Sequence, residues 1–393
     1  MHGSDTGSLT PVVPSGQPLP FVLMRGGTSK AVFLRGSDLP RDVDERDATI
    51  LSLFGSPDPR QIDGLGGADL LTSKLAIIDP PTHPEADIDY TFAQVSISEA
   101  VVDYDINCGN ISAAVGAYAV DEGLVVSVTE PITVVRIHNT NTDRILLAHV
   151  PTHGGRAAVD GSYVVHGVPG SGAPIGLDFG ATAGGITGSL FPTGNVLDEL
   201  VTPFGSVPVS IVDLANLTVF FAARDVGMVG TEGPSDMTDD MFARVAAIKA
   251  AAAEALGIDG GGLIPVPAMV AAPASYTAFA SGTRIDAEDV DLLARVVGGR
   301  PPVLHKAYPG TLAACTGAAA LISGTTVHRV ARQRDSDEVR IGHTSGVMPV
   351  SARVASDGQG WSVESAVYNR TARRIAEGTT FVRSSTGTQR DGE

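Results

Sequence analysis

A cysteine beside a predicted helix start is the first group in the sequence that could do acid–base chemistry. The run Asn107-Cys108-Gly109-Asn110 leads into a predicted small-residue helix, Asn110–Val120. The first N–H groups of a helix lack partners within it and carry positive partial charge. They can bind a carboxylate and can lower the pKa of a thiol. Cys108 is therefore a candidate to supply or accept a proton, and the alternative is a plain helix cap with an inert, buried thiol.

A lysine at the start of an apolar strand is the second candidate. Lys74 stands in Leu71-Thr-Ser-Lys-Leu-Ala-Ile-Ile78, just after the glycine-rich loop Asp63–Asp69. Such a lysine either extends its ammonium group to solvent or lies in a pocket. In a pocket, burial disfavours the charged form and makes the amine a usable base. The sequence leaves both interpretations open.

Two further polar loops could hold an anionic ligand. Arg25–Lys30 has two cations, two hydroxyls and two glycines in six residues, which suits a carboxylate clamp or an ordinary hairpin turn. It lacks the spacing of a phosphate-binding loop. The second loop is His305-Lys-Ala-Tyr308, followed by Thr311. A single histidine there is as readily structural as catalytic.

Composition and motif searches exclude several classes of protein. The 44 acidic and 27 basic residues give a net charge of −17, which argues against nucleic-acid binding. An anionic ligand must then be held by local donors. The nine histidines show no metal-ligand spacing, and no dinucleotide fingerprint opens a helix, so neither a metal nor another cofactor is predicted.

The cysteines and the first residues indicate the compartment. Two cysteines cannot build a disulfide framework and are typical of a reducing compartment. No apolar run is long enough to span a membrane, and the first 20 residues lack a secretory signal. The sequence therefore predicts a cytoplasmic protein with no membrane partner.

Short apolar runs separated by turn residues predict many strands and few helices, which favours an α+β fold. The predicted strands of the first half are Phe21–Met24, Ala31–Leu34, Leu75–Ile78, Thr91–Ser96, Ile132–Ile137, Ile145–Val150 and Tyr163–Val168. Asp160-Gly161 and Asp357-Gly358 predict hairpin turns. The predicted helices are Val43–Phe54, Asn110–Val120, Ser235–Leu256, Asp286–Val297 and Arg370–Ala376.

Two internal echoes indicate a duplication. Ala31–Asp38 is similar to Thr218–Asp225 at an offset of 187 residues, and Asn107–Ala114 is similar to Gly310–Gly317 at an offset of 203. Both offsets are about half the chain, and the order of elements is the same. We therefore expect two related halves that meet near residues 185–195.

Taken together, the loops resemble the PrpF family of tricarboxylate isomerases. The resemblance rests on Met24–Lys30, Asp63–Asp69 through Lys74, and Asn107–Asn110, and it extends from about residue 20 to 385. Later segments agree, namely Pro192–Asn195, His305–Tyr308, Gly342–Gly346 and Arg370–Arg374. The family includes 2-methylaconitate cis-trans isomerase and 4-oxalomesaconate tautomerase.

The resemblance implies a diaminopimelate-epimerase-like α+β fold. Two pseudo-symmetric domains, each a β-sheet wrapped around a central helix, would enclose a site in the cleft between them. The expected division is a flexible leader at 1–19, one domain at 20–187 and a second at 188–393. The last segment of the second domain is expected to pack back on the first.

The resemblance also assigns residues. Lys74 and Cys108 map onto the family's catalytic pair. The residues that map onto substrate contacts are Thr28, Ser29, Lys30, Ser73, Asn107, Gly109, Asn110, Lys306 and Thr311. Epimerases of this fold use one cysteine from each half. In the second half that position falls on Thr311 or Cys315, and the family's threonine favours Thr311.

The activity implied is a cofactor-independent isomerisation of a small unsaturated di- or tricarboxylate. A proton is removed and returned through an allylic carbanion. One rival is an amino-acid epimerase, which needs a second thiolate facing Cys108. Another is a non-catalytic protein that binds polycarboxylates. Dimers are common among such folds, although the charge pattern does not fix the oligomeric state.

Overall fold

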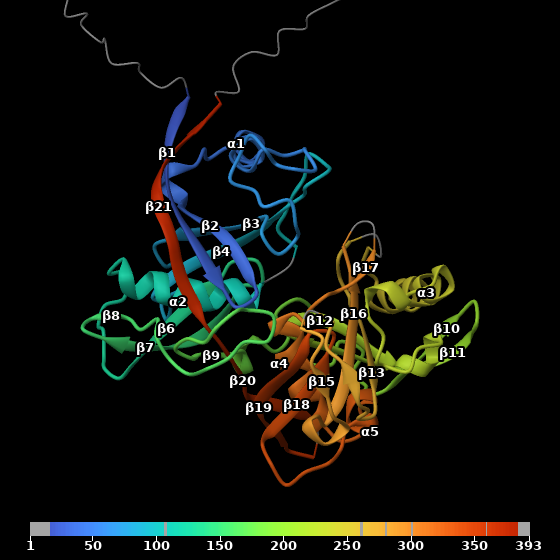
Figure 1. The fold of residues 1–393 in the computed structure, drawn as a ribbon. Coiled ribbons are helices and arrows are strands. Elements are labelled where there is room, and N and C mark those ends of the chain that lie inside the picture. The colour runs from blue at the N-terminus through green and yellow to red at the C-terminus, as the bar shows by residue number, and fades with distance from the viewer. Residues whose placement is uncertain are drawn as a thin grey trace, which may run out of the picture.

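A computed structural model describes residues 16–105, 108–259, 262–279, 281–299, 302–358 and 360–383. Its strands pair into one network of 19, with β14 (Tyr276–Thr277) and β15 (Arg284–Ile285) as a separate pair, and helices are few (Figure 1). This confirms the predicted α+β class. None of the described helices is long and apolar enough to cross a membrane.

The first half wraps strands around helix α2 (Gly109–Asp121), which is buried from Gly109 to Val120. A helix enclosed on all sides reads as apolar around its whole circumference. Small side chains let the strands approach, and a Cβ at Gly116 would press on Ala148. The strands around α2 include β1 (Gln17–Gly26), β2 (Ser29–Arg35), β3 (Lys74–Asp79), β4 (Ile88–Val95), β6 (Ile132–Asn139), β7 (Arg144–His153) and β9 (Ile175–Asp178).

The second half repeats this arrangement around helix α4 (Gly310–Leu321), whose residues are buried from Gly310 to Ala320. Alanine, glycine and threonine again dominate the helix. Its strands include β11 (Gly205–Leu214), β12 (Asn216–Ala222), β13 (Val266–Ala271), β16 (Leu292–Gly298), β18 (Glu338–His343) and β19 (Gly346–Ser356).

Strand pairing follows the same sequence in both halves, which confirms the predicted pseudo-symmetry. β1–β2 is antiparallel, and β2–β3 is parallel across α1 (Val43–Phe54). β3–β4 is antiparallel, β4–β6 is parallel across α2, and β6–β7 is antiparallel. The second half repeats this series. β11–β12 is antiparallel, β12–β13 is parallel across α3 (Asp239–Leu256), and β13–β16 is antiparallel. β16–β18 is then parallel across α4, and β18–β19 is antiparallel.

The two sequence echoes fall on equivalent elements. Ala31–Asp38 and Thr218–Asp225 each cover a strand followed by a short 3₁₀ turn. The central helices are equivalent as well, but their first residues are Gly109 and Gly310. The second echo is therefore two residues out of register with the structure.

The last two strands return to the first half. β20 (Trp361–Arg370) pairs with β19 and with β9, and β21 (Ala372–Val382) pairs with β1. Figure 1 shows β21, in red, running beside the blue β1. The remaining elements are β5 (Val102–Asp103), β8 (Arg156–Ala157), β10 (Asp198–Thr202), β17 (Val303–Leu304) and α5 (Thr326–Val330), with short 3₁₀ turns between elements.

Several expected boundaries need correction. β1 begins at Gln17, inside the predicted leader, of which residues 1–15 lie outside the described residues. α3 begins at Asp239 rather than Ser235, because the Thr238 side chain caps the N–H of Met241. Tyr163–Val168 is not a strand and contributes only an isolated bridge to Gly172.

Two predicted helices are strands. Asp286–Val297 contains a 3₁₀ turn followed by β16, and Arg370–Ala376 spans the end of β20 and the start of β21. β16 is buried on both faces, so it lacks the alternation that marks a half-buried strand. A short continuous apolar run cannot be distinguished from a helix by periodicity alone. Asp357-Gly358 does lie between two paired strands, as predicted, whereas Asp160-Gly161 does not.

Candidate functional site

The starts of the two central helices meet at the side chain of Tyr368. A Cβ on Gly109 or on Gly310 would collide with the Tyr368 hydroxyl. The Thr311 methyl group would lie 3.3 Å from a Cβ at Gly109. The positively polarised ends of α2 and α4 therefore converge on one region, where their free N–H groups favour an anion.

Cys108 stands at this convergence as the N-terminal residue before α2. It is partly exposed, and its carbonyl accepts hydrogen bonds from the N–H and the hydroxyl of Ser112 at 3.0 and 3.2 Å. Burial raises the pKa of Tyr368, and the nearby Cys108 raises it further. The Cys108 side chain packs against the core cluster that contains Tyr368 of β20.

Lys74 is the first residue of β3 and is only 7% exposed. Its Nζ donates to Oε1 of Gln94 at 2.7 Å and lies 5.0 Å from the ring centroid of Phe92. The amide nitrogen of Gln94 donates to the carbonyls of Ser73 and Leu70, which turns its oxygen toward the lysine. Of the two alternatives that the sequence left open, the side chain is therefore buried rather than extended to solvent.

The second half approaches Lys74 through the loop that precedes α4. Burial lowers the pKa of His305 to about 4, and the charge of Lys74 is among the further causes that lower it. The His305 ring is held in place by the backbone of Ala307. The charge of Lys74 thus disfavours protonation of His305, although the two residues come from opposite halves of the chain.

Asn110 links α2 to the β1–β2 hairpin and to β20. Its amide donates to the Thr28 hydroxyl at 3.1 Å, and its oxygen accepts from Nε of Arg370 at 2.8 Å. The other half has a related bond, because Asn216 at the β11–β12 turn donates to Thr311 at 2.9 Å. Each helix start is thus fixed to the neighbouring hairpin.

A cavity of about 190 Å³ lies beside this linkage, between elements of both halves. Its polar lining residues are Thr28, Tyr163, His166, Tyr308, His343 and Arg370. Lys74 and Cys108 are not among the residues that line it. The cavity is joined to the α2 start through Asn110, which contacts both Thr28 and Arg370.

The other predicted contacts differ in their surroundings. Ser29 is buried and its hydroxyl has no hydrogen-bond partner among the described residues, whereas the Ser73 hydroxyl donates to Gln61 at 2.7 Å. Lys30 is partly exposed and Lys306 is exposed. Asn107 lies outside the described residues.

Cys315 is fully buried in the interior of α4. Its sulfur faces the carbonyl of Val212 at 4.0 Å, and burial raises its pKa. Thr311 stands in the first turn of that helix, next to Gly310. Of the two residues weighed for the second-half position, Thr311 is therefore the one at the helix start.

The sequence does not mark Gln94, Tyr368 and Arg370 as candidate site residues, nor Asn216 as the partner of Thr311. Gln94 and Tyr368 are single polar side chains within strands, and no local pattern marks them. Arg370 fell in a segment predicted to be a helix. A strand prediction there would have placed Tyr368 and Arg370 on the same face, because side chains alternate along a strand.

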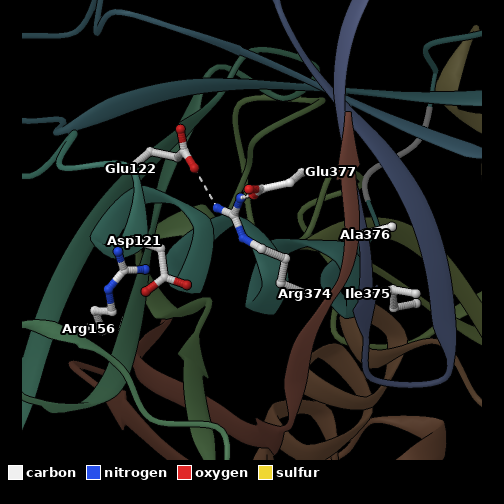
Figure 2. Close-up of a pocket in the computed structure, with 7 residues that line it drawn as sticks. All are labelled: Asp121, Glu122, Arg156, Arg374, Ile375, Ala376 and Glu377. Atoms are coloured by element: carbon white, nitrogen blue, oxygen red, sulfur yellow. Dashed lines mark hydrogen bonds and ion pairs between the residues drawn. The ribbon is translucent and has the colours of Figure 1, made fainter. Parts of the chain in front are cut away.

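A larger groove, of about 500 Å³, lies at the opposite end of α2 (Figure 2). Asp121 and Glu122 end the helix there, where the dipole disfavours anions. Its Arg374 is paired with Glu122 and with Glu377. This groove is therefore a poor site for an anionic substrate.

Comparison with known proteins places the chain in a family. The family model of the PrpF protein matches residues 17–383. The chain belongs to the PrpF family. It is 52% identical to 3-methylitaconate isomerase of Eubacterium barkeri, over 93% of this chain and 97% of that protein. It is 39% identical to 2-methyl-aconitate isomerase of Shewanella oneidensis, over 92% of this chain and 95% of that protein.

Solved structures of an isomerase and of an epimerase agree with the fold. A crystal structure of methylitaconate-delta-isomerase matches with a TM-score of 0.80 and 50% identity, over 94% of this chain and 97% of that one. A hydroxyproline epimerase of Agrobacterium vitis matches with a TM-score of 0.56 over 94% of each chain, and at 11% identity it shares the fold alone. The predicted PrpF membership and epimerase-like fold are confirmed, and the chain is an isomerase.

Proposed function

We propose that this PrpF protein isomerises a small unsaturated di- or tricarboxylate by moving a proton along an allylic system. The observation that carries the proposal is a buried amine, Lys74, close to a loop of the second half, together with a partly exposed thiol, Cys108, where two helix starts converge. Relatives that match nearly the whole chain are named for methylitaconate and 2-methylaconitate.

The proposed reaction needs only proton transfer. Lys74, as the free amine, removes a proton from a carbon next to the unsaturated bond. The electron pair spreads over the allylic system into a carboxylate, where the N–H groups at the starts of α2 and α4 stabilise the negative charge. The proton returns to the other allylic carbon, or to the same carbon after rotation about the weakened bond. Cys108 acts as the acid or as a partner base.

The remaining site assignments are part of this proposal. The residues that would border the substrate are Thr28, Ser29, Lys30, Ser73, Asn107, Gly109 and Asn110 in the first half and Lys306 and Thr311 in the second. No cofactor takes part in the proposed steps. Two free thiols suit a reducing, cytoplasmic compartment. We place the domain boundary between residues 187 and 188, as expected from the sequence.

Solvent-deuterium exchange tests the two catalytic assignments. The purified protein is incubated in deuterated water with 3-methylitaconate or 2-methylaconitate, and exchange and isomer formation are followed by NMR. Lys74→Ala and Cys108→Ser are expected to stay folded and to lose about 10²–10⁴-fold in rate.

A matched control comes from the second cysteine. Cys315→Ser makes the same chemical change inside α4, away from the helix starts, so its exchange rate should stay near that of the unmodified protein. Full exchange in both catalytic variants would remove the assignments. Binding without exchange by the unmodified protein would instead support a non-catalytic carboxylate-binding role.

The epimerase alternative gains no support from the second half. It requires a thiolate opposite Cys108, but Thr311 occupies the first turn of α4. Cys315 is enclosed in the helix interior, where burial raises its pKa and disfavours a thiolate.

A further inference from the structure

Arg370, the last residue of β20, is a buried cation that no described carboxylate neutralises. It is 3% exposed, and in the described chain no Asp or Glu forms an ion pair with it. Its Nε donates to Asn110, and Nη1 donates to the carbonyl of Asn369 at 2.8 Å. Its guanidinium carbon lies 4.6 Å from the ring centroid of Tyr368. A buried charge with only neutral partners is unfavourable unless an anion joins it.

The remaining guanidinium nitrogen has a weak partner. Nη2 points at the sulfur of Met348, 2.8 Å away, and a thioether is a poor hydrogen-bond acceptor. A carboxylate oxygen would be a much stronger acceptor for the same donor. The Nη2 group of Arg370 therefore has only a poor acceptor among the described residues.

Arg370 also lines the cavity of about 190 Å³, which has room for a ligand group. His343, the last residue of β18, lines the same cavity. Burial together with the charge of Arg370 holds the pKa of His343 well below its ordinary value. His343 therefore stays neutral, and Arg370 rather than His343 is the positive charge in the lining of this cavity. Thr28 adds a hydroxyl from the opposite half.

We propose that this cavity binds one carboxylate of the substrate, with Arg370 as its counter-ion. The inference rests on the proposed function and extends it by assigning a residue and a position to one acidic group. Asn110 is then a positioning residue, because its side chain is committed to Thr28 and Arg370. Since Asn110 is in the first turn of α2, a carboxylate held here anchors the substrate beside the convergent helix starts.

Calorimetric titration of the full chain with trans-aconitate tests the subsite without requiring turnover. Arg370→Gln is expected to weaken binding at least ~30-fold, because it removes a buried charge partner. The affinity of Arg370→Lys for trans-aconitate should lie between those of the unmodified protein and Arg370→Gln, since a lysine keeps the charge but lacks the planar set of guanidinium donors. Unchanged affinity in Arg370→Gln would overturn the proposal.

A second variant keeps the test decisive if the arginine variants do not fold. Met348→Glu places a carboxylate beside the guanidinium, which should preserve folding and block trans-aconitate at least ~30-fold by pairing with Arg370. Met348→Gln, which has the same shape without the charge, should weaken binding clearly less than Met348→Glu, because its amide can accept from Arg370 but does not neutralise it. Equal affinities for the two Met348 variants would contradict the proposal.

The outcomes separate this inference from the proposed function. Binding that depends on Arg370 in a protein that exchanges no deuterium would leave the subsite standing and remove the catalytic proposal. If the unmodified protein exchanges deuterium but Arg370→Gln binds trans-aconitate with unchanged affinity, the catalytic proposal would stand and the subsite would be removed.

Discussion

At the scale of single residues, Lys74 has a neutral amide, that of Gln94, as its hydrogen-bond partner. Gln94 is turned by two backbone carbonyls so that its oxygen accepts from Nζ. A neutral acceptor fixes the position of the amine without adding a negative charge that would favour the ammonium form. Phe92 covers another side of the lysine with an aromatic face. Both contacts restrain the position of the Lys74 side chain.

Gln94→Glu tests this arrangement. A carboxylate at that position favours the ammonium form of Lys74, so the rise of kcat/KM with pH should move to higher pH. At pH 7, kcat/KM is expected to fall about tenfold, because about 1.4 kcal/mol in favour of the ammonium form lowers the fraction of free amine about tenfold. At alkaline pH, kcat/KM should recover. The measurement is a pH–rate profile of isomerisation.

The control for this prediction makes the same substitution on the surface. Gln333 is exposed and donates only to backbone carbonyls, so Gln333→Glu should leave the profile in place. A Gln94→Glu profile that keeps its shape and loses rate equally at every pH would show that the residue does not act through the proton on Lys74.

At the scale of elements, a histidine holds the end of β6 to its neighbours. Nδ1 of His138 contacts Asp89 of β4 at 2.9 Å, and Nε2 contacts Asp143 of the following turn at 3.0 Å. The Thr82 hydroxyl donates to the other oxygen of Asp89 at 2.6 Å. Burial alone would lower the pKa of His138, but hydrogen bonds to Asp143 and Asp89 raise it above its ordinary value.

The stability that this cluster provides depends on pH in a predictable direction. A raised folded-state pKa means that protonated His138 stabilises the fold below its unfolded pKa of about 6.5. That contribution is lost as pH rises through the folded-state pKa. The difference in unfolding free energy between the unmodified protein and His138→Gln should therefore be larger at pH 6 than at pH 9.

Urea unfolding at the two pH values measures this difference. His153→Gln is the matched control, because that side chain is 92% exposed and its contact with Glu130 is 4.0 Å long. It should change stability little at either pH. A His138→Gln penalty that is the same at pH 6 and pH 9 would mean that its charge is not what holds the strands.

At the scale of the whole molecule, the two halves are not separable along the chain. β9 and β1, in the first half, obtain partners from β20 and β21 at the other end of the sequence. β1 pairs with β21 along its entire length, from Gln17 opposite Val382 to Gly26 opposite Ala372. An exposed strand edge is a site of aggregation. The first half alone would leave such edges without partners.

Fragments test this dependence. Residues 16–187 alone are expected to be poorly folded, whereas fusing residues 361–383 before residue 16 through a short glycine linker should restore cooperative unfolding, because Val382 lies opposite Gln17. Circular dichroism during thermal unfolding measures the outcome. A cooperative transition of similar midpoint in the unfused fragment would show that the returning strands are dispensable.

Local chemistry allowed much of the structure to be predicted from the sequence. The bounds of α1 were predicted as observed, because Asp42 caps its start and Gly55 ends it in a left-handed conformation. The duplication was visible because the two halves keep similar strands. The chemistry-bearing segments that mark the PrpF family are short and local, so they needed no coordinates.

Tertiary structure alone decided the features that depend on distant partners. Protein covers both faces of the strand β16, so its sequence lacks the alternation of apolar and polar residues that would predict a strand. Arg370 meets Asn110, 260 positions away in the sequence, only because β20 returns to the first half. The sequence determined which groups are available for chemistry, through side-chain type and local backbone preference. The fold decided which of them meet, because burial and pairing join segments that share no local signal.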